Sequence, residues 1–102
     1  MSRETKTLTV LFADISDSSR LYSQLGDADA RNAITACLDI LTGILPKFEG
    51  RLVKTLGDAI MCVFPDAANA VNAAAEMQTL ASQSAGQNGP ALHLHIGLHA
   101  GP

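Results

Sequence analysis

Two aspartates and a lysine stand where apolar segments meet turns. Asp14 ends the apolar run LTVLFAD, and Asp58 follows Gly57 in the segment RLVKTLGDAIMCVF, residues 51–64. Carboxylate oxygens at strand ends beside a glycine turn are suited to holding a divalent metal ion against a phosphate. Lys54 adds an opposite charge to the same otherwise apolar segment. A metal-dependent phosphate site is therefore the first hypothesis.

Each of these residues also has an ordinary structural explanation. Asp14 taken alone is typical of a helix cap or turn, and Asp58 of a hairpin turn. Lys54 alone is typical of an edge strand, where a charge discourages pairing with other chains. Three histidines share one strand face at a spacing that could ligate zinc, but a fourth ligand is not evident, so an interface or solvated face is favoured: His93, His95 and His99.

The segments that carry these residues are predicted to be strands. In residues 6–13, one side of the strand carries Leu8, Val10 and Phe12. The other side carries Thr7, Thr9 and Leu11 and is thus not fully polar. Residues 51–64 are predicted to form a β-hairpin, because Gly57 can adopt the positive φ that a tight turn needs. Residues 92–98 alternate strictly, which predicts a further strand.

Helical patterns fill the intervals. A turn rich in N-cap residues precedes a predicted short helix, Ser18 to Leu25. We expect Asp27 to cap a second helix that runs to about Phe48, closed by Pro46 and Gly50. Its apolar positions recur at helical spacing: Ala30, Ile34, Cys37, Leu38, Leu41, Ile44 and Leu45.

An alanine-rich segment follows the hairpin. Pro65–Asp66 is expected to end a strand and to cap a helix from Ala67 to about Ala81. We expect this helix to face the sheet with Val71, Ala74 or Ala75, and Leu80. The segment SQSAGQNGP, residues 82–90, is predicted to be a flexible polar loop.

The order of these elements, β-α-α-β-β-α-β, predicts an α+β fold. It matches the ferredoxin-like plan, in which helices cover one face of a four-stranded antiparallel sheet. Several strands are apolar on both faces, so the uncovered face is expected to pack on a second subunit. A chain of 102 residues predicts one domain.

Composition excludes some function classes. A net charge of −3 and a pI near 5.4 argue against a broad nucleic-acid-binding surface. No apolar run approaches a membrane span, and residues 2–7 are not a signal segment, so we expect no membrane contact from this chain. Cys37 and Cys62 are expected to be reduced core thiols of a cytoplasmic protein; a disulfide is the minor alternative.

Three motifs together resemble the class III nucleotidyl cyclases of the bacterial adenylate cyclase kind. They are VLFADIS at 10–16, GRLVKTLGDAIMCVF at 50–64 and HIGLHAGP at 95–102. The resemblance covers almost the whole chain and implies the cyclase fold. It also implies an activity, the conversion of ATP to 3′,5′-cyclic AMP and pyrophosphate.

The resemblance implies a role for each matching residue. Asp14 and Asp58 match the two metal-binding aspartates, which would hold two Mg²⁺ or Mn²⁺ ions on the ATP phosphates. The backbone carbonyl at Ile15 would also touch a metal ion. The triphosphate would meet backbone N–H groups at a helix start. Residues 16–19 would supply these N–H groups. The expected substrate-binding residues are Ile15, Ser16, Asp17, Ser18, Ser19, Lys54 and Gly57 of the turn.

Lys54 matches the residue that reads the purine, and a lysine at this position implies ATP whereas glutamate implies GTP. The family works as dimers in which one subunit supplies the metal aspartates and the other the lysine. The resemblance therefore implies a homodimer in which Lys54 and Asp58 belong to different active sites.

The sequence departs from the family pattern in two ways. Asp17-Ser18-Ser19 replaces Gly-Phe-Thr or Gly-Ser-Thr, and Asp17 either caps the helix, which we favour, or repels triphosphate. The second departure is that the chain ends at Pro102, before the family's second purine-reading residue and its transition-state Asn and Arg. We therefore expect residues 1–102 to be a C-terminally truncated catalytic domain that is inactive alone, with any regulatory domain C-terminal.

Two alternatives remain. A degenerate cyclase-like module would bind a nucleotide or partner without turnover. A diguanylate cyclase is ranked lower, because the hairpin reads LGDA and not GGDEF or GGEEF.

Overall fold

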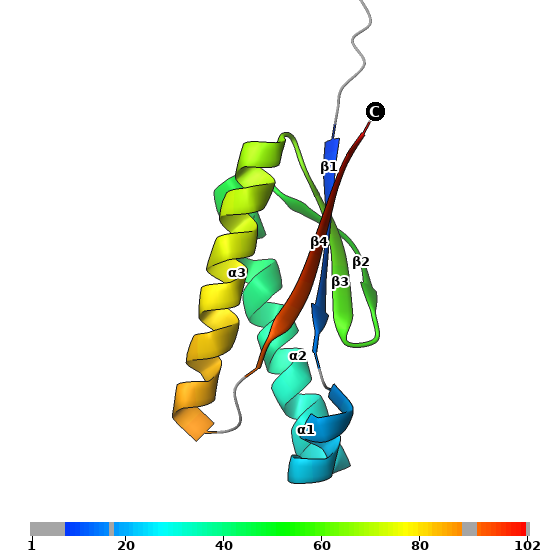
Figure 1. Ribbon diagram of the computed structural model, residues 1–102, viewed down its shortest axis with the longest axis vertical. Coiled ribbons are helices and arrows are strands. Elements are labelled where there is room, and N and C mark those ends of the chain that lie inside the picture. The colour runs from blue at the N-terminus through cyan, green and yellow to red at the C-terminus, as the bar shows by residue number, and fades with distance from the viewer. Residues whose placement is uncertain (1–7, 17, 89–91, 102) are drawn as a thin grey trace, which may run out of the picture.

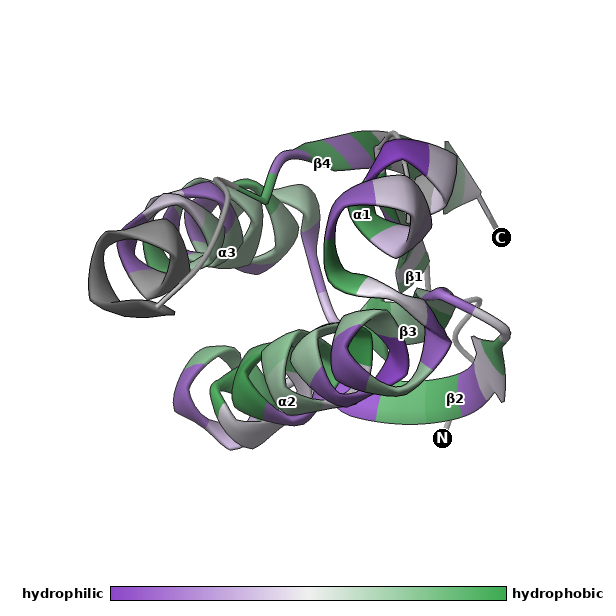
Figure 2. Cartoon of the chain, turned by 90° about the horizontal axis from the view of Figure 1, so that it is seen from below, coloured by the Kyte–Doolittle hydropathy of each residue, from purple (hydrophilic) through white to green (hydrophobic). Residues whose placement is uncertain are grey.

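The computed structural model describes residues 8–16, 18–88 and 92–101, and within them the predicted α+β fold is present. The strands form one antiparallel sheet in the order β2-β3-β1-β4. α2 and α3 lie on the same side of this sheet, and no described element covers the other side (Figure 1, Figure 2). The elements in chain order are β1 (Leu8–Ile15), α1 (Ser18–Leu25), α2 (Asp27–Gly43), the 3₁₀ helix η1 (Leu45–Phe48), β2 (Arg51–Leu56), β3 (Ala59–Phe64), α3 (Ala67–Asn88) and β4 (Leu94–Gly101).

Local turn and cap chemistry fixes several of these boundaries as predicted. Gly57 has a φ of 61°, and Leu56 pairs with Ala59 to close the β2–β3 hairpin. Asp66 caps α3, because its Oδ1 accepts a hydrogen bond from the Asn69 N–H at 2.8 Å. The bounds of α1 are those predicted.

The core lies between the helices and the covered face of the sheet. Alternate residues of β1 and β3 face inward and meet one side of each helix. The buried apolar residues of the strands are Leu11, Ala13, Ile15, Ile60, Cys62, Phe64 and Leu94, and those of α2 are Ala30, Ile34, Cys37, Leu38 and Leu41. The predicted core face of α2 is thereby confirmed, with Ile44 only half-buried and Leu45 buried in η1.

Both cysteines are buried and free, as predicted. The Cys62 thiol lies 3.7 Å from the Leu11 carbonyl oxygen, to which it can donate a weak hydrogen bond. Burial raises the pKa of the Cys37 thiol and raises that of Cys62 from 9.0 to about 11. Both side chains therefore act as small apolar core residues.

Helix α3 differs from its prediction in length and in orientation. It runs to Asn88, so residues 82–88 are helical where a loop was predicted; residues 89 and 90 lie outside the described residues. Ser and Gln are tolerated in helices, and a helical glycine costs only about 1 kcal/mol. The inward positions of the helix are Ala70, Ala73, Met77 and Ala81, and not the predicted set: Val71 is 53% exposed, Ala75 is exposed, and Ala74 and Leu80 are half-buried.

Boundaries of β1, α2 and β4 also differ from the prediction. β1, predicted over residues 6–13, continues to Ile15, and residues 6 and 7 lie outside the described residues. α2 ends at Gly43, and the chain continues as η1 with Pro46 in its first turn. Asp27 is the first residue of α2, whose N-cap is Gly26. β4 begins at Leu94 and extends to Gly101, because its C-terminal residues pair with the start of β1.

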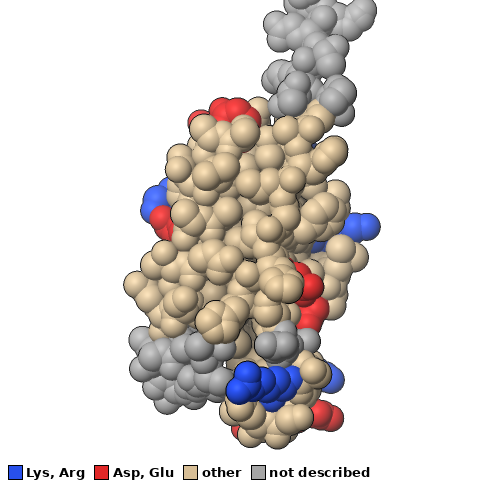
Figure 3. Space-filling view, viewed as in Figure 1, with Lys and Arg blue, Asp and Glu red and all other residues tan. Residues whose placement is uncertain are grey.

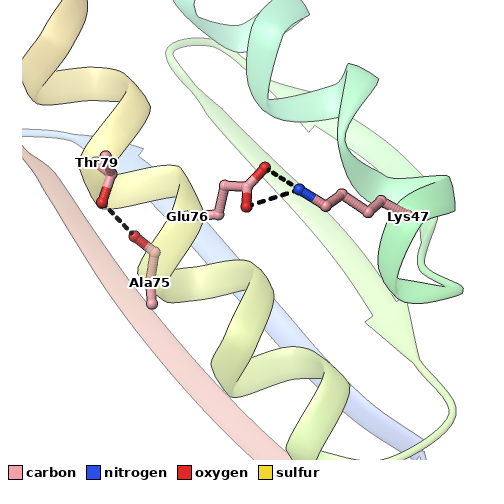
Figure 4. Close-up of polar contacts among 4 residues, drawn as sticks. All are labelled: Lys47, Ala75, Glu76 and Thr79. Carbon is pink, nitrogen blue, oxygen red and sulfur yellow. Dashed lines mark hydrogen bonds and ion pairs between the residues drawn. The ribbon is translucent and has the colours of Figure 1, made fainter.

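A salt bridge joins η1 to α3 in the helical layer. Lys47 of η1 forms a salt bridge with Glu76 of α3, in which the Lys47 Nζ lies 2.9 Å from the Glu76 Oε2. Within α3, the Thr79 hydroxyl donates to the Ala75 carbonyl oxygen (Figure 4).

Seen from the side of α3 and β4, the centre of the surface is largely uncharged (Figure 3). Among the described residues, no helix is both long enough and apolar enough to cross a membrane.

Candidate catalytic site

The two aspartates lie at the same end of the sheet, in neighbouring segments. Asp14 is next to last in β1 and pairs with Ala59, the residue that follows Asp58. The Ile15 N–H donates to the Asp58 carbonyl oxygen at 3.2 Å, which ties the end of β1 to the β2–β3 turn (Figure 1). Asp14 is exposed and Asp58 is half-buried, so both carboxylates remain accessible to a ligand.

Strand register places Asp14 on the uncovered side of the sheet, which we call the open face. Every second residue of the strands lies on it, and Phe12 is 42% exposed there. The residues of the open face are Leu8, Val10, Phe12 and Asp14 of β1, Arg51, Lys54 and Leu56 of β2, Ala59, Met61 and Val63 of β3, and His95, Gly97, His99 and Gly101 of β4.

A bulge in β2 determines the side on which Lys54 lies. Leu52 pairs with Cys62 and Lys54 pairs with Met61, so Val53 between them has no partner in the register. Arg51 and Lys54, three residues apart, therefore share the open face, whereas regular alternation would put them on opposite faces. All six residues of β2 are exposed.

Lys54 and Asp14 lie two strands apart on the open face. They are separated by two strand spacings and by two residues along the strands, which corresponds to about 12 Å between Cα atoms. Within the described part of the chain, no salt bridge joins Lys54 to Asp14 or to Asp58. The structure brings the two aspartates together and leaves the lysine apart.

The segment after Asp14 leads from β1 into α1. Ile15 is only 2% exposed as a whole residue, so its side chain belongs to the core. The Ser16 N–H donates to the His93 carbonyl oxygen at 2.8 Å, and the buried Ser16 hydroxyl has no hydrogen-bond partner among the described residues. Ser18 begins α1 and Ser19 is exposed, while Asp17 lies outside the described residues.

The donor set at this end suits a hard divalent cation. Residues 8–16, 18–88 and 92–101 contain no group of three or more His, Cys, Asp or Glu side chains placed to hold a metal ion. A pair of carboxylates matches Mg²⁺ or Mn²⁺, since Mg²⁺ usually keeps several waters and takes its remaining ligands from substrate phosphates. His93, which precedes β4, and His95 and His99 of β4 belong to no such group among these residues.

A family model described as the adenylate and guanylate cyclase catalytic domain matches residues 1–102. The chain belongs to this family. A search of curated proteins found no match.

Solved structures share the fold of this cyclase domain. The adenylyl cyclase CyaB from P. aeruginosa is 24% identical with a TM-score of 0.76, covering 99% of this chain and 59% of that one. A bacterial light-regulated adenylyl cyclase is 22% identical with a TM-score of 0.83, covering 97% and 55%. The guanylyl cyclase domain of RhoGC from the fungus Blastocladiella emersonii is 22% identical with a TM-score of 0.78, covering 98% and 60%. This cyclase domain thus spans less than two thirds of these chains.

Two features of the site could not be predicted from sequence. One is the bulge at Val53, because the letters RLVKTL carry no bulge signal. The other is the cross-strand pairing of Asp14 with His95 and of Phe12 with Gly97, which depends on the register between β1 and β4. The alternation of residues 92–98 indicated a strand but not its partner.

Proposed function

We propose that this domain is part of an enzyme that converts ATP to 3′,5′-cyclic AMP and pyrophosphate as a homodimer in the cytoplasm. The observation that carries the proposal is the placement of Asp14 and Asp58 at one end of the sheet, tied by the Ile15–Asp58 backbone hydrogen bond. Two carboxylates of neighbouring segments are a compact anionic site for the cations that accompany a nucleoside triphosphate.

The residues of this site have separate tasks. Asp14 and Asp58, with the Ile15 carbonyl, would hold two Mg²⁺ or Mn²⁺ ions. When bound, such ions lower the pKa of the ribose 3′-hydroxyl and neutralise the charge that builds on the phosphates. N–H groups at the start of α1, which begins at Ser18, would meet the triphosphate, whereas the Ser16 N–H already donates to the His93 carbonyl oxygen. Gly57, exposed in the turn, adds no side chain that would obstruct the phosphates.

Lys54 would select the purine. A lysine ammonium donates to the N1 edge of adenine, whereas guanine presents an N–H donor there and would be repelled. In the proposed homodimer, the lysine of one copy would complete the site of the other. Within one copy, no salt bridge among the described residues joins Lys54 to Asp14 or to Asp58.

The solved relatives are longer, since this chain spans 55–60% of the three chains compared above. Groups outside residues 1–102 would supply donors to the transferring phosphate and the second purine-reading residue. Loss of one such donor lowers the rate by about 10²–10³-fold. We therefore expect turnover only from a chain that contains these groups.

The test is product formation by the natural full-length chain with Mn²⁺, supplied with ATP or with GTP. We expect cyclic AMP from ATP, and a loss of about 100-fold or more in Asp58→Asn. The matched control is Asp39→Asn, the same change at an exposed site on α2, which should retain activity. Cyclic GMP as the main product would refute the purine assignment. A folded chain that binds Mn²⁺ and ATP without turnover would identify a degenerate binding module instead.

A further inference from the structure

Gly97 lies in the interior of β4 on the open face, where nothing in the described chain requires a glycine. A Cβ added at this position would meet no atom within 4 Å, and its φ is not in the left-handed region. A glycine inside a strand costs roughly 0.5–1 kcal/mol relative to alanine. Such a residue often marks the close approach of a ligand or of another backbone.

The surroundings of Gly97 point to an external contact. It pairs with Phe12, whose side chain is 42% exposed, and it has His95 and His99 as its neighbours on the same face of β4. The adjoining Val10, Met61 and Val63 are half-buried. Gly97 therefore borders an apolar centre that no element of the described chain covers.

One row across the sheet links Gly97 to Lys54. The paired residues of this row run from edge to edge as Lys54, Met61, Phe12 and Gly97. Lys54 and Gly97 thus occupy the same position along the strand direction, on opposite edges of the sheet. A two-fold axis parallel to the strands would exchange these edges and bring Lys54 of one copy above Gly97 of another.

The distribution of charge favours a two-fold axis parallel to the strands over one perpendicular to them. Arg51 and Lys54 both lie on the β2 edge of the open face, whereas β4 contains no Lys or Arg. An axis perpendicular to the strands would place β2 over β2 and set like charges against each other, which costs affinity. The parallel axis instead moves both cations to the β4 side, next to the strand that carries Asp14.

We propose that Gly97 is the position over which the partner's Lys54 passes toward Asp14 in the homodimer proposed above. The absence of a side chain at Gly97 leaves room for the lysine stem beside Phe12. This inference rests on the proposed homodimeric function, and it assigns to Gly97 a role in admitting the partner's purine-reading residue.

Cysteine cross-linking tests the arrangement without measuring catalysis. Lys54→Cys and Gly97→Cys are prepared separately in the natural full-length chain, at exposed positions where neither change touches the core. Each variant alone, and a mixture of both, is treated with a short bifunctional thiol reagent. The native Cys37 and Cys62 are 2% and 0% exposed, so the unmodified chain gives the background.

We expect covalent dimers in the mixture and only background in each variant alone. Dimers formed by Lys54→Cys alone would indicate β2 over β2 and overturn the proposal, as would a mixture that stays at background. The result is independent of turnover. A chain that cross-links as expected but makes no cyclic nucleotide would retain this inference and reject the proposed activity.

A second variant tests the role of the missing side chain. Gly97→Val should leave the melting temperature unchanged or raise it, since valine favours strands. It should raise the KM for ATP about tenfold or more. A valine side chain in the path of the partner's Lys54 would cost about as much free energy as an overpacked side chain in a core. The control is Gly43→Ala, where an added Cβ also meets nothing within 4 Å. An unchanged KM, or a lower melting temperature, would show that Gly97 serves neither the partner nor the site.

Discussion

Among the glycines for which the structure describes the surroundings, Gly50 should be the least tolerant of alanine. It precedes β2, and its N–H donates to the Leu45 carbonyl oxygen at 2.8 Å. A Cβ added there would lie 2.5 Å from Cε2, 2.9 Å from Cδ2 and 3.0 Å from Cζ of Phe64. The Phe64 ring is 1% exposed and is surrounded by the core, so it has no free space into which to move.

We therefore expect Gly50→Ala to destabilise the fold by about 1–3 kcal/mol, the usual cost of overpacking. For a domain of this size, each kcal/mol lowers Tm by about 4–8 °C. The shift is measured by thermal denaturation beside Gly43→Ala, which adds the same methyl group in open space. Because the clash is with one ring, Gly50→Ala combined with Phe64→Leu should cost less than the sum of the two single changes. An unchanged Tm for Gly50→Ala would refute this reasoning.

Three further predictions concern the site, a helix cap and a core thiol. Lys54→Glu should lower turnover of ATP about 10- to 150-fold by removing a charged hydrogen bond and should favour GTP, with unchanged stability because Lys54 is exposed; an unaltered ATP-to-GTP ratio would contradict it. Asp66→Ala removes the 2.8 Å cap of α3 and should cost about 1 kcal/mol in urea denaturation, whereas Asp66→Asn should retain most of that stability. The pKa of Cys62 is raised from 9.0 to about 11, so its contribution to stability is complete below pH 9 and is lost as pH rises through 11. Cys62→Ala should show a smaller loss of stability over that interval, and an identical loss would argue against the thiol as its source.

Local chemistry was sufficient to predict much of the fold. A glycine with positive φ, an aspartate cap and the helical spacing of α2 each depend on residues close in sequence, and each is found as predicted. The α+β class followed from the order of these elements. The motifs indicated the cyclase family, which the family model matching residues 1–102 confirms.

Long-range packing could not be predicted in the same way. In α3, alanines occur at so many positions that several faces are equally apolar, and contact with the sheet selects Ala70, Ala73 and Met77 over Val71. Met77 is fully buried because a flexible unbranched side chain fills the gap that the small alanines leave.

The site was predicted in part for the same reason. Asp14 and Asp58 end local elements, so the prediction that each stands at a turn or strand end was correct. Their adjacency depends on β1 pairing with β3, and the side on which Lys54 lies depends on the bulge at Val53. Metal binding and purine reading by these residues remain predictions.

The exposure of β2 has a consequence for how such a domain can change in evolution. None of its six residues belongs to the hydrophobic core, although Lys54 is the residue proposed to choose the base. Substitutions on this strand are therefore largely free of the stability cost that accompanies core changes. A lineage could exchange one nucleotide for the other by single mutations while every intermediate stays folded, and adenylyl and guanylyl cyclases are both found among the solved relatives of this fold.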